Sequence, residues 1–187
     1  MMSAAAIVLG LMVLAAVIVV FLLPAPRRVV EDGPGAALRR GILSRDFLGP
    51  DPAGPPERVL GAVMDIGVGD SGLTVVAMED GSVSLYTSRG GGALGMGAVP
   101  SVAEAAAAFR AQALAFRDEL EVLDDPVPPW PPGGRAAFFL VTAGATLGSG
   151  HVPGRELERD EHELTPWFEA GKAVLEAIQA ARLPTGP

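Results

Sequence analysis

The sequence predicts an α+β protein with one transmembrane helix at its N-terminus. Three observations support this fold class. An uncharged run of twenty residues extends from Ala4 to Leu23. Three β-rich runs follow one another between residues 59 and 88, and two later segments repeat apolar residues every three or four positions. The element order β-β-β-α-β-β-α predicts a five-stranded antiparallel sheet with two long helices on one face.

The N-terminal apolar run is long enough to cross a lipid bilayer. A helix of twenty residues spans about 30 Å, which matches the hydrocarbon thickness of a membrane. A cleaved signal peptide would have a basic start, a shorter apolar run and a small-residue cleavage site. No Lys or Arg precedes the run, and Pro24 and Pro26 surround the only small residue at its end, Ala25. We therefore expect residues 1–23 to be an uncleaved anchor that contacts the bilayer through residues 4–23.

Arginines lie on only one side of this segment. Four lie within about 20 residues of its C-terminal end, the range that decides orientation, and none lies on the N-terminal side. Because basic residues stay on the cytoplasmic side, the N-terminus is expected outside and the C-terminal domain in the cytoplasm. The predicted location is the inner (plasma) membrane, with a single pass. The arginines are Arg27, Arg28, Arg39 and Arg40.

Residues 24–58 are predicted to form a Pro/Gly-rich tether. They contain seven prolines and no apolar period that would bury one face. Two short apolar groups, 36–38 and 42–48, would make one amphipathic turn on the membrane or on the domain; a disordered spacer is the alternative. Residues 59–187 carry 8 basic and 17 acidic residues, so the acidic excess of the chain belongs to the domain that follows.

The domain at 59–187 begins with three β-rich runs, at 59–68, 73–79 and 82–88. Glycine and aspartate separate the runs, and this composition is typical of tight hairpin loops. The sequence therefore predicts a three-stranded antiparallel meander.

A long helix is predicted after residue 100. Ser101 and Glu104 have the spacing of a capping box at a helix N-terminus. Apolar residues then recur at steps of three and four, which predicts one buried face. Five prolines between 126 and 132 predict an extended crossing, with Trp130 folded back onto the body. The apolar positions are Val102, Ala106, Phe109, Ala113, Phe116, Leu120 and Leu123.

Two more strands and a second helix complete the predicted domain. The strands are expected at 136–142 and 145–150, and Thr165 and Pro166 begin a helix with Trp167 on its apolar face. This order of elements is the layout of profilin-like, longin and roadblock domains. The similarity is one of topology, and such folds carry many unrelated functions.

A strand followed by a glycine-rich loop carries a resemblance that extends over the domain. Residues 80–92 have the pattern DGSxSLYxSxGGG, and Gly95 and Gly97 follow them. The segment resembles small bacterial α+β domain proteins of unassigned function. Those proteins are also similar to this chain in the following helix and in an ending like residues 164–168. The resemblance covers residues 59–183 and implies no activity.

The glycine-rich loop is the candidate interaction site. Phosphate-binding loops run directly into a helix N-terminus, so that free backbone N–H groups point at the anion. Here Ala98, Val99 and Pro100 intervene, and Ser101 is expected to cap the helix. We therefore expect the loop to supply flexible backbone or a close approach to a protein partner. Its residues are Arg89, Gly90, Gly91, Gly92, Gly95 and Gly97.

Asp65 is the centre of the alternative function, a small phosphate- or metal-dependent enzyme. Its Asp-x-Gly turn resembles the first phosphate loop of the actin and sugar-kinase superfamily, but the second such loop and about half of the length are missing. Asp65 with Glu104 or Glu119 also resembles the magnesium site of ribonuclease H-like nucleases. The fourth strand lacks a carboxylate, however, and the body is acidic where a nuclease needs a basic channel. The simpler interpretation of Asp65 is a turn residue.

Composition and spacing exclude several other classes. The chain has no cysteine, which removes thiol catalysis and cysteine-ligated zinc, and its formal charge of −8 opposes nucleic-acid binding. His151 and His162 lie among acidic residues without the spacing of a zinc site, and Ser149 lies in a predicted hairpin rather than a nucleophile elbow. We assign no catalytic, metal-binding or cofactor-binding residue. The expected function is a membrane-anchored, non-enzymatic interaction or scaffold module that binds another protein or itself.

Overall fold

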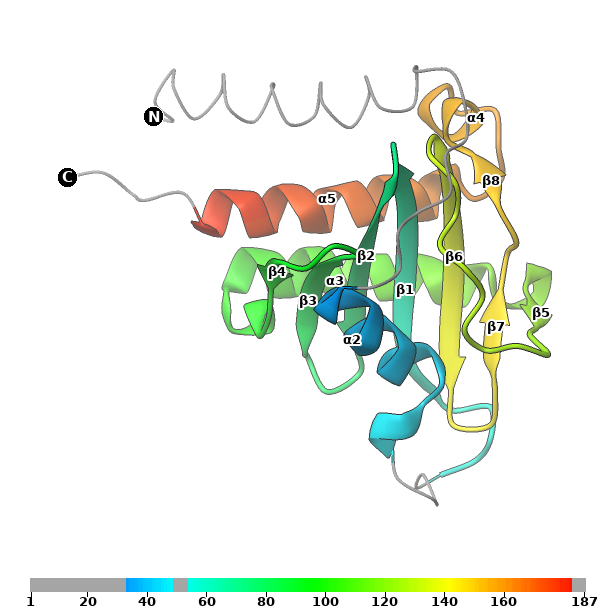
Figure 1. Ribbon diagram of the computed structural model, residues 1–187. Helices are drawn as coiled ribbons and strands as arrows, with labels where there is room; N and C mark the ends of the chain where they lie inside the picture. Colours follow the sequence, from blue (N-terminus) through cyan, green and yellow to red (C-terminus); the bar gives the residue numbers. More distant parts are fainter. Residues whose placement is uncertain (1–32, 49–53, 183–187) are drawn as a thin grey trace.

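An antiparallel sheet runs through the part of the chain that the computed structural model describes, residues 33–48 and 54–182 (Figure 1). The strands are β1 (Val59–Val68), β2 (Ser71–Met78), β3 (Val83–Thr87), β4 (Gly92–Ala93), β5 (Glu121–Val122), β6 (Arg135–Thr142), β7 (Thr146–Gly148) and β8 (Val152–Pro153). Seven of them follow the order β4-β3-β2-β1-β6-β7-β5, and β8 pairs with the start of β6. The long strand β1 therefore lies at the centre, between β2 and β6.

The prediction of a five-stranded sheet is wrong, because the described residues contribute eight strands. The three strands that were not predicted, β4, β5 and β8, have two residues each and are too short to show a period. Each forms because its backbone pairs with a neighbouring strand: β4 with β3, β5 with β7 and β8 with β6. The five longer strands begin and end within two residues of the predicted ranges.

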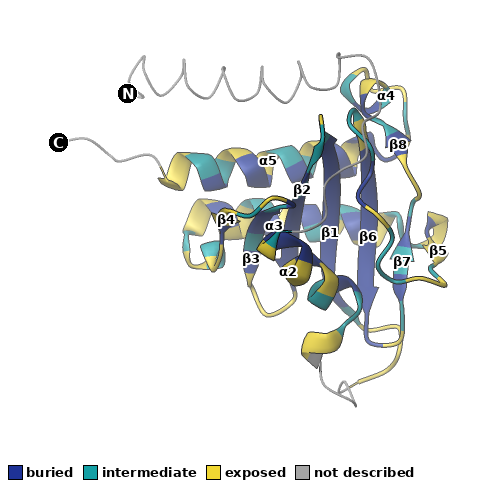
Figure 2. Ribbon diagram, viewed as in Figure 1, coloured by how far each residue is buried: buried dark blue, intermediate teal, exposed yellow. Residues whose placement is uncertain are grey.

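Two long helices, α3 (Pro100–Ala115) and α5 (Thr165–Arg182), pack side by side on one face of the sheet, here called the first face (Figure 1). Side chains alternate along a strand, so every second residue of β1, including Met64, points to this face. These side chains meet Phe109 of α3 and Trp167 of α5, which are completely buried. The central strands β1 and β6 are buried along most of their length (Figure 2). The larger of the two apolar cores therefore lies on the first face.

Helix α3 begins and ends differently from the prediction. Its first residue is Pro100, and no side chain caps it, so the predicted capping box of Ser101 and Glu104 does not form. Proline suits this position because it has no N–H group to leave unpaired. The helix stops before Phe116, and the 3₁₀ turn η3 (Arg117–Glu119) then leads into β5.

A short helix, α2 (Pro34–Leu43), covers the opposite side of the sheet, the second face (Figure 1). It lies inside the region predicted to be a tether. Ala36, Arg39 and Leu43 recur at steps of three and four on its buried side, and the 3₁₀ turn η1 (Asp46–Leu48) follows it. The second face therefore has a helical cover of ten residues.

An extended segment, residues 123–132, crosses the second face beside α2. Leu123 and Val127 pack against the core of this face, and Trp130 is buried. The expectation that Trp130 folds back onto the body is therefore confirmed.

The predicted transmembrane helix, with the location in the inner (plasma) membrane, is contradicted by the structure. In the described ranges, no helix is both long enough and apolar enough to cross a membrane. The longest of these helices, α5, carries charged residues such as Glu169 and Glu176 on its exposed side. The predicted bilayer contact falls on residues 4–23, which lie outside the described residues.

Candidate functional site

Asp65 lies inside β1 and not in a turn. It pairs with Thr74 of β2 on one side and with Ala137 of β6 on the other. Because its neighbours Met64 and Ile66 point to the first face, Asp65 points to the second face. Its side chain is completely buried, so the fold must supply partners for its carboxylate.

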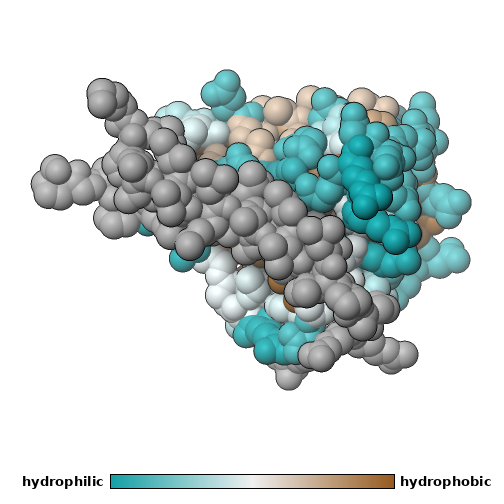
Figure 3. All heavy atoms as spheres, turned by 90° about the horizontal axis from the view of Figure 1, so that it is seen from above, coloured by the Kyte–Doolittle hydropathy of each residue, from teal (hydrophilic) through white to brown (hydrophobic). Residues whose placement is uncertain are grey.

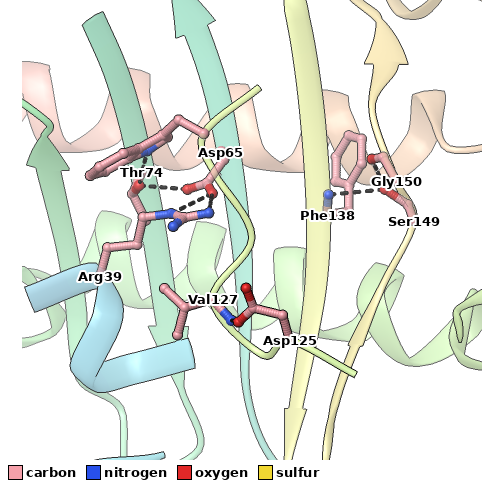
Figure 4. Close-up of polar contacts among 9 residues, drawn as sticks. Arg39, Asp65, Thr74, Asp125, Val127, Phe138, Ser149 and Gly150 are labelled. Carbon is pink, nitrogen blue, oxygen red and sulfur yellow. Dashed lines mark hydrogen bonds and ion pairs between the residues drawn. The ribbon is translucent and has the colours of Figure 1, made fainter. Parts of the chain in front are cut away.

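Arg39 supplies the positive charge from α2 (Figure 4). Its Nε lies 2.7 Å and its Nη2 lies 2.6 Å from Oδ2 of Asp65, and the arginine is only 2% exposed. Thr74 donates a hydrogen bond from Oγ1 to Oδ1 of the same carboxylate at 2.5 Å. Both oxygens of Asp65 are therefore engaged within the protein. Leaving a buried charge without its partner costs about 3–5 kcal/mol.

Trp130 covers this ion pair from the extended segment. Its Nε1 donates a hydrogen bond to Oγ1 of Thr74 at 2.9 Å, and its ring centre lies 4.6 Å from the guanidinium carbon of Arg39. The Phe139 ring lies 5.8 Å from the same carbon. Beneath Trp130, a Cβ on Gly72 would lie 2.5 Å from the indole ring, so glycine makes room for it. We call Asp65, Thr74, Trp130 and Phe139 the arginine pocket.

Electrostatics in the pocket reflect its burial. Burial raises the pKa of the Asp65 carboxyl above its ordinary value, and the guanidinium of Arg39 opposes this increase. His151, between β7 and β8, interacts electrostatically with both Asp65 and Arg39. Partial burial lowers the pKa of its imidazole, Arg135 acts in the same direction, and a hydrogen bond to the backbone of Pro129 opposes them. The net effect keeps His151 neutral further into the acid range than an ordinary histidine.

The arrangement holds a side chain in place and does not offer a free carboxylate. Both oxygens of Asp65 are occupied, and Glu104 lies exposed on α3, at the opposite face of the sheet. Asp65 and Glu104 therefore do not converge on a common ion. Across residues 33–48 and 54–182, no group of three or more His, Cys, Asp and Glu side chains is arranged to hold a metal.

The glycine-rich loop folds back along β3. Gly92 pairs with Tyr86 and Ala93 pairs with Leu85, which makes β4 one edge of the sheet. Ala93 is buried, whereas the next residue, Leu94, is 63% exposed. Sequence reasoning did not single out Leu94, because an isolated leucine among glycines has no period.

Glycine is required at several positions of this loop. A Cβ on Gly97 would lie 1.8 Å from the carbonyl oxygen of Gly81, and a Cβ on Gly92 would lie 2.0 Å from that of Leu85. Positive φ angles, which glycine adopts at little cost, also define the path of the chain. They occur at Gly90, Gly91, Gly92 and Gly95. The loop has a specific conformation and makes close backbone contacts with its own domain.

Two local features flank the loop. Arg89 forms an ion pair with Asp70, with Nη2 and Oδ2 2.5 Å apart, and both side chains are about half exposed. Exposed pairs of this kind contribute little to stability. At the other end, the 3₁₀ turn η2 (Met96–Ala98) separates the loop from α3. The loop therefore does not run into a helix N-terminus as a phosphate-binding loop would.

The remaining polar candidates have structural roles. His162 accepts a hydrogen bond at Nδ1 from the backbone N–H of Leu164 at 3.1 Å. Ser149 accepts one from the backbone N–H of Phe138 and donates one to the carbonyl of Gly150 (Figure 4).

Hydrophilic residues gather on the side of the molecule that carries the short helix α4 (Gly154–Glu158) (Figure 3).

Arg39 is the site residue that sequence reasoning missed. In the sequence it is one of several basic residues near the N-terminus. Its signal was its place in a helical pattern: Pro34 suits a first helical residue, and Ala36, Arg39 and Leu43 follow at steps of three and four. A charge on the otherwise apolar side of such a pattern points to a buried partner.

No known protein family, curated protein or solved structure matches the chain. The comparisons therefore connect it with no enzyme family. The resemblance to small bacterial proteins of unassigned function remains a prediction.

Proposed function

We propose that the protein is a non-enzymatic interaction module that binds a protein partner, or a second copy of itself, through its glycine-rich loop. The observation that carries this proposal is the exposure of the Leu94 side chain. It is 63% exposed, yet it directly follows Ala93, which is buried and paired with Leu85 of β3. A large apolar side chain is thus presented from a backbone of defined shape, and preorganisation lowers the entropic cost of binding.

Charge supports the same assignment. The net charge of the chain is −8, but the fourteen residues from Gly90 to Ala103 include no charged residue. Uncharged surface costs less to remove from water than charged surface. A partner would therefore meet an uncharged surface that includes Leu94, with polar residues such as Arg89 at its border.

The environment of Asp65 argues against an enzymatic role. This residue is the one that best resembled a catalytic carboxylate, and both of its oxygens are bound to Arg39 and Thr74. A metal or phosphate mechanism would have to break these contacts first.

Site-specific photocrosslinking tests the proposal. A photoreactive amino acid at position 94 should crosslink to a defined protein, and the same group at Leu114 on α3, itself 50% exposed, is the matched control. Burying a leucine is worth about 1.5–3 kcal/mol, so Leu94→Asp should weaken binding of the purified partner at least about tenfold. Equal crosslinking from both positions, or full affinity of Leu94→Asp, would contradict the proposal.

A further inference from the structure

The arginine pocket has the chemistry of a receptor for a guanidinium group. The carboxylate of Asp65 faces one edge of the guanidinium at 2.6 and 2.7 Å, and the ring of Trp130 covers it at 4.6 Å. Arginine suits such a site because its planar group donates in parallel to a carboxylate and stacks on aromatic rings. The pocket belongs entirely to the body at 54–182, whereas Arg39 belongs to the segment 33–48.

The segment 33–48 has few apolar anchors of its own. Helix α2 has ten residues and no side-chain cap, and helices this short are marginal in isolation. Apart from Arg39, the side chains that it buries are those of Ala36 and Leu43. Hydrogen bonds to the body complete the attachment: Gly33 N–H to the Ser88 carbonyl, Thr146 Oγ1 to the Leu43 carbonyl, and Arg45 Nη1 to the Ala143 carbonyl.

We propose that α2 is an exchangeable occupant of the arginine pocket, and that α2 of one copy fills the pocket of a second copy. The exchange keeps every contact of the pocket, because the incoming helix has the same sequence as the one that it replaces. Exchange of an identical element between copies is accordingly a low-cost route to a dimer.

The chain between the two parts is short. Residues 54–58 already contact the body, because the carbonyls of Pro56 and Arg58 accept hydrogen bonds from Gly144 and Ala143. Residues 49–53 make the connection, and five residues reach at most about 17–18 Å when extended. Short hinge loops favour exchange between copies.

Complementation between two full-length variants tests the proposal. Arg39→Met leaves a pocket without its guanidinium, and Asp65→Leu leaves a guanidinium without its carboxylate. When the two are mixed, an exchanged heterodimer restores one native Arg39–Asp65 pair and places Met beside Leu in the other site. Because a broken buried pair is strongly destabilising, the heterodimer should exceed either homodimer by about a hundredfold or more in native mass spectrometry.

Matched controls use the exposed ion pair at the start of the loop. A mixture of Arg89→Met and Asp70→Leu carries the same pair of substitutions where both side chains are about half exposed, and it should give no preferred heterodimer. Folded Arg39→Met and Asp65→Leu that stay monomeric in the mixture would overturn the proposal.

A second measurement applies to a variant that does not fold alone. Refolding Arg39→Met and Asp65→Leu together should then recover the circular dichroism of the wild type, together with a heterodimer. Failure of joint refolding would overturn the proposal as well. Leu94→Asp, which alters the glycine-rich loop, should leave the exchange unchanged, so the proposed function and this inference can fail independently.

Discussion

The two faces of the sheet are covered by different kinds of contact. On the first face, two long helices pack through apolar side chains, and the four largest fully buried side chains all belong to its core: Trp167, Phe109, Phe138 and Phe168. On the second face, a ten-residue helix is fixed around a buried ion pair. Apolar packing supplies stability with little directional preference, whereas the ion pair has one geometry. The first face therefore stabilises the fold, and the second determines where one segment lies.

The largest effect is expected on the first face. Phe109→Ala should lower the free energy of unfolding by about 3–5 kcal/mol, because it opens a cavity among completely buried side chains. Urea denaturation followed by circular dichroism measures the loss. Phe116→Ala, at a half-buried position beyond the end of α3, is the control and should cost clearly less. Equal losses at the two positions would mean that the first face is not the stabilising core.

On the second face, the two partners of the ion pair should differ in cost. Asp65→Asn leaves the charge of Arg39 buried without compensation and should cost about 3 kcal/mol. Arg39→Met should cost less, because the pKa of Asp65 is already raised by burial and the carboxyl can take up a proton. Urea denaturation at neutral pH compares them, with the exposed Asp70→Asn as control. The reverse order would show that Asp65 stays charged without Arg39.

A smaller effect is expected from the indole of Trp130. Trp130→Phe removes the hydrogen bond from Nε1 to Thr74 and keeps an aromatic ring over Arg39, so the loss should be about 1 kcal/mol. Thermal unfolding is a suitable measurement. A loss as large as that of Asp65→Asn would mean that ring size, not the hydrogen bond, holds the pocket together.

The smallest effect concerns His151 and depends on pH. The pKa of its imidazole is lowered in the folded protein from the ordinary value of 6.5. Its contribution to stability is therefore fully present above 6.5 and is lost as the pH falls from there through the lowered pKa. His151→Gln removes this part of the pH dependence. Between about pH 7.5 and 5.5 the variant should therefore lose less stability than the wild type. Identical pH profiles would show that the imidazole is effectively solvated.

Long apolar runs made most of the sheet predictable. The strand at 59–68 has the expected limits, because ten residues of β-rich sequence between turn signals are unambiguous. The two-residue strands escaped prediction, since their pairing depends on which backbone lies alongside. In β4 that neighbour is β3, and the glycines that bring the loop close to it appeared in the sequence only as signs of flexibility.

The arginine pocket was harder to predict than the sheet. Asp65 was recognised as unusual, but its partner could not be chosen from the sequence, because six arginines lie between residues 24 and 58. Only the docked helix selects Arg39, and the docking depends on Trp130 and Phe139, which lie far along the chain. A contact between such distant segments leaves no local pattern.

The same separation determines when the pocket can form during protein synthesis. Arg39 leaves the ribosome 100 residues before Phe139, a delay of about 5–20 s at typical rates of about 5–20 residues per second. During this interval the helix has neither its carboxylate cradle nor its aromatic cover in finished form. On a polysome, the undocked α2 of one nascent chain and the newly completed arginine pocket of a neighbouring chain would then meet at high local concentration.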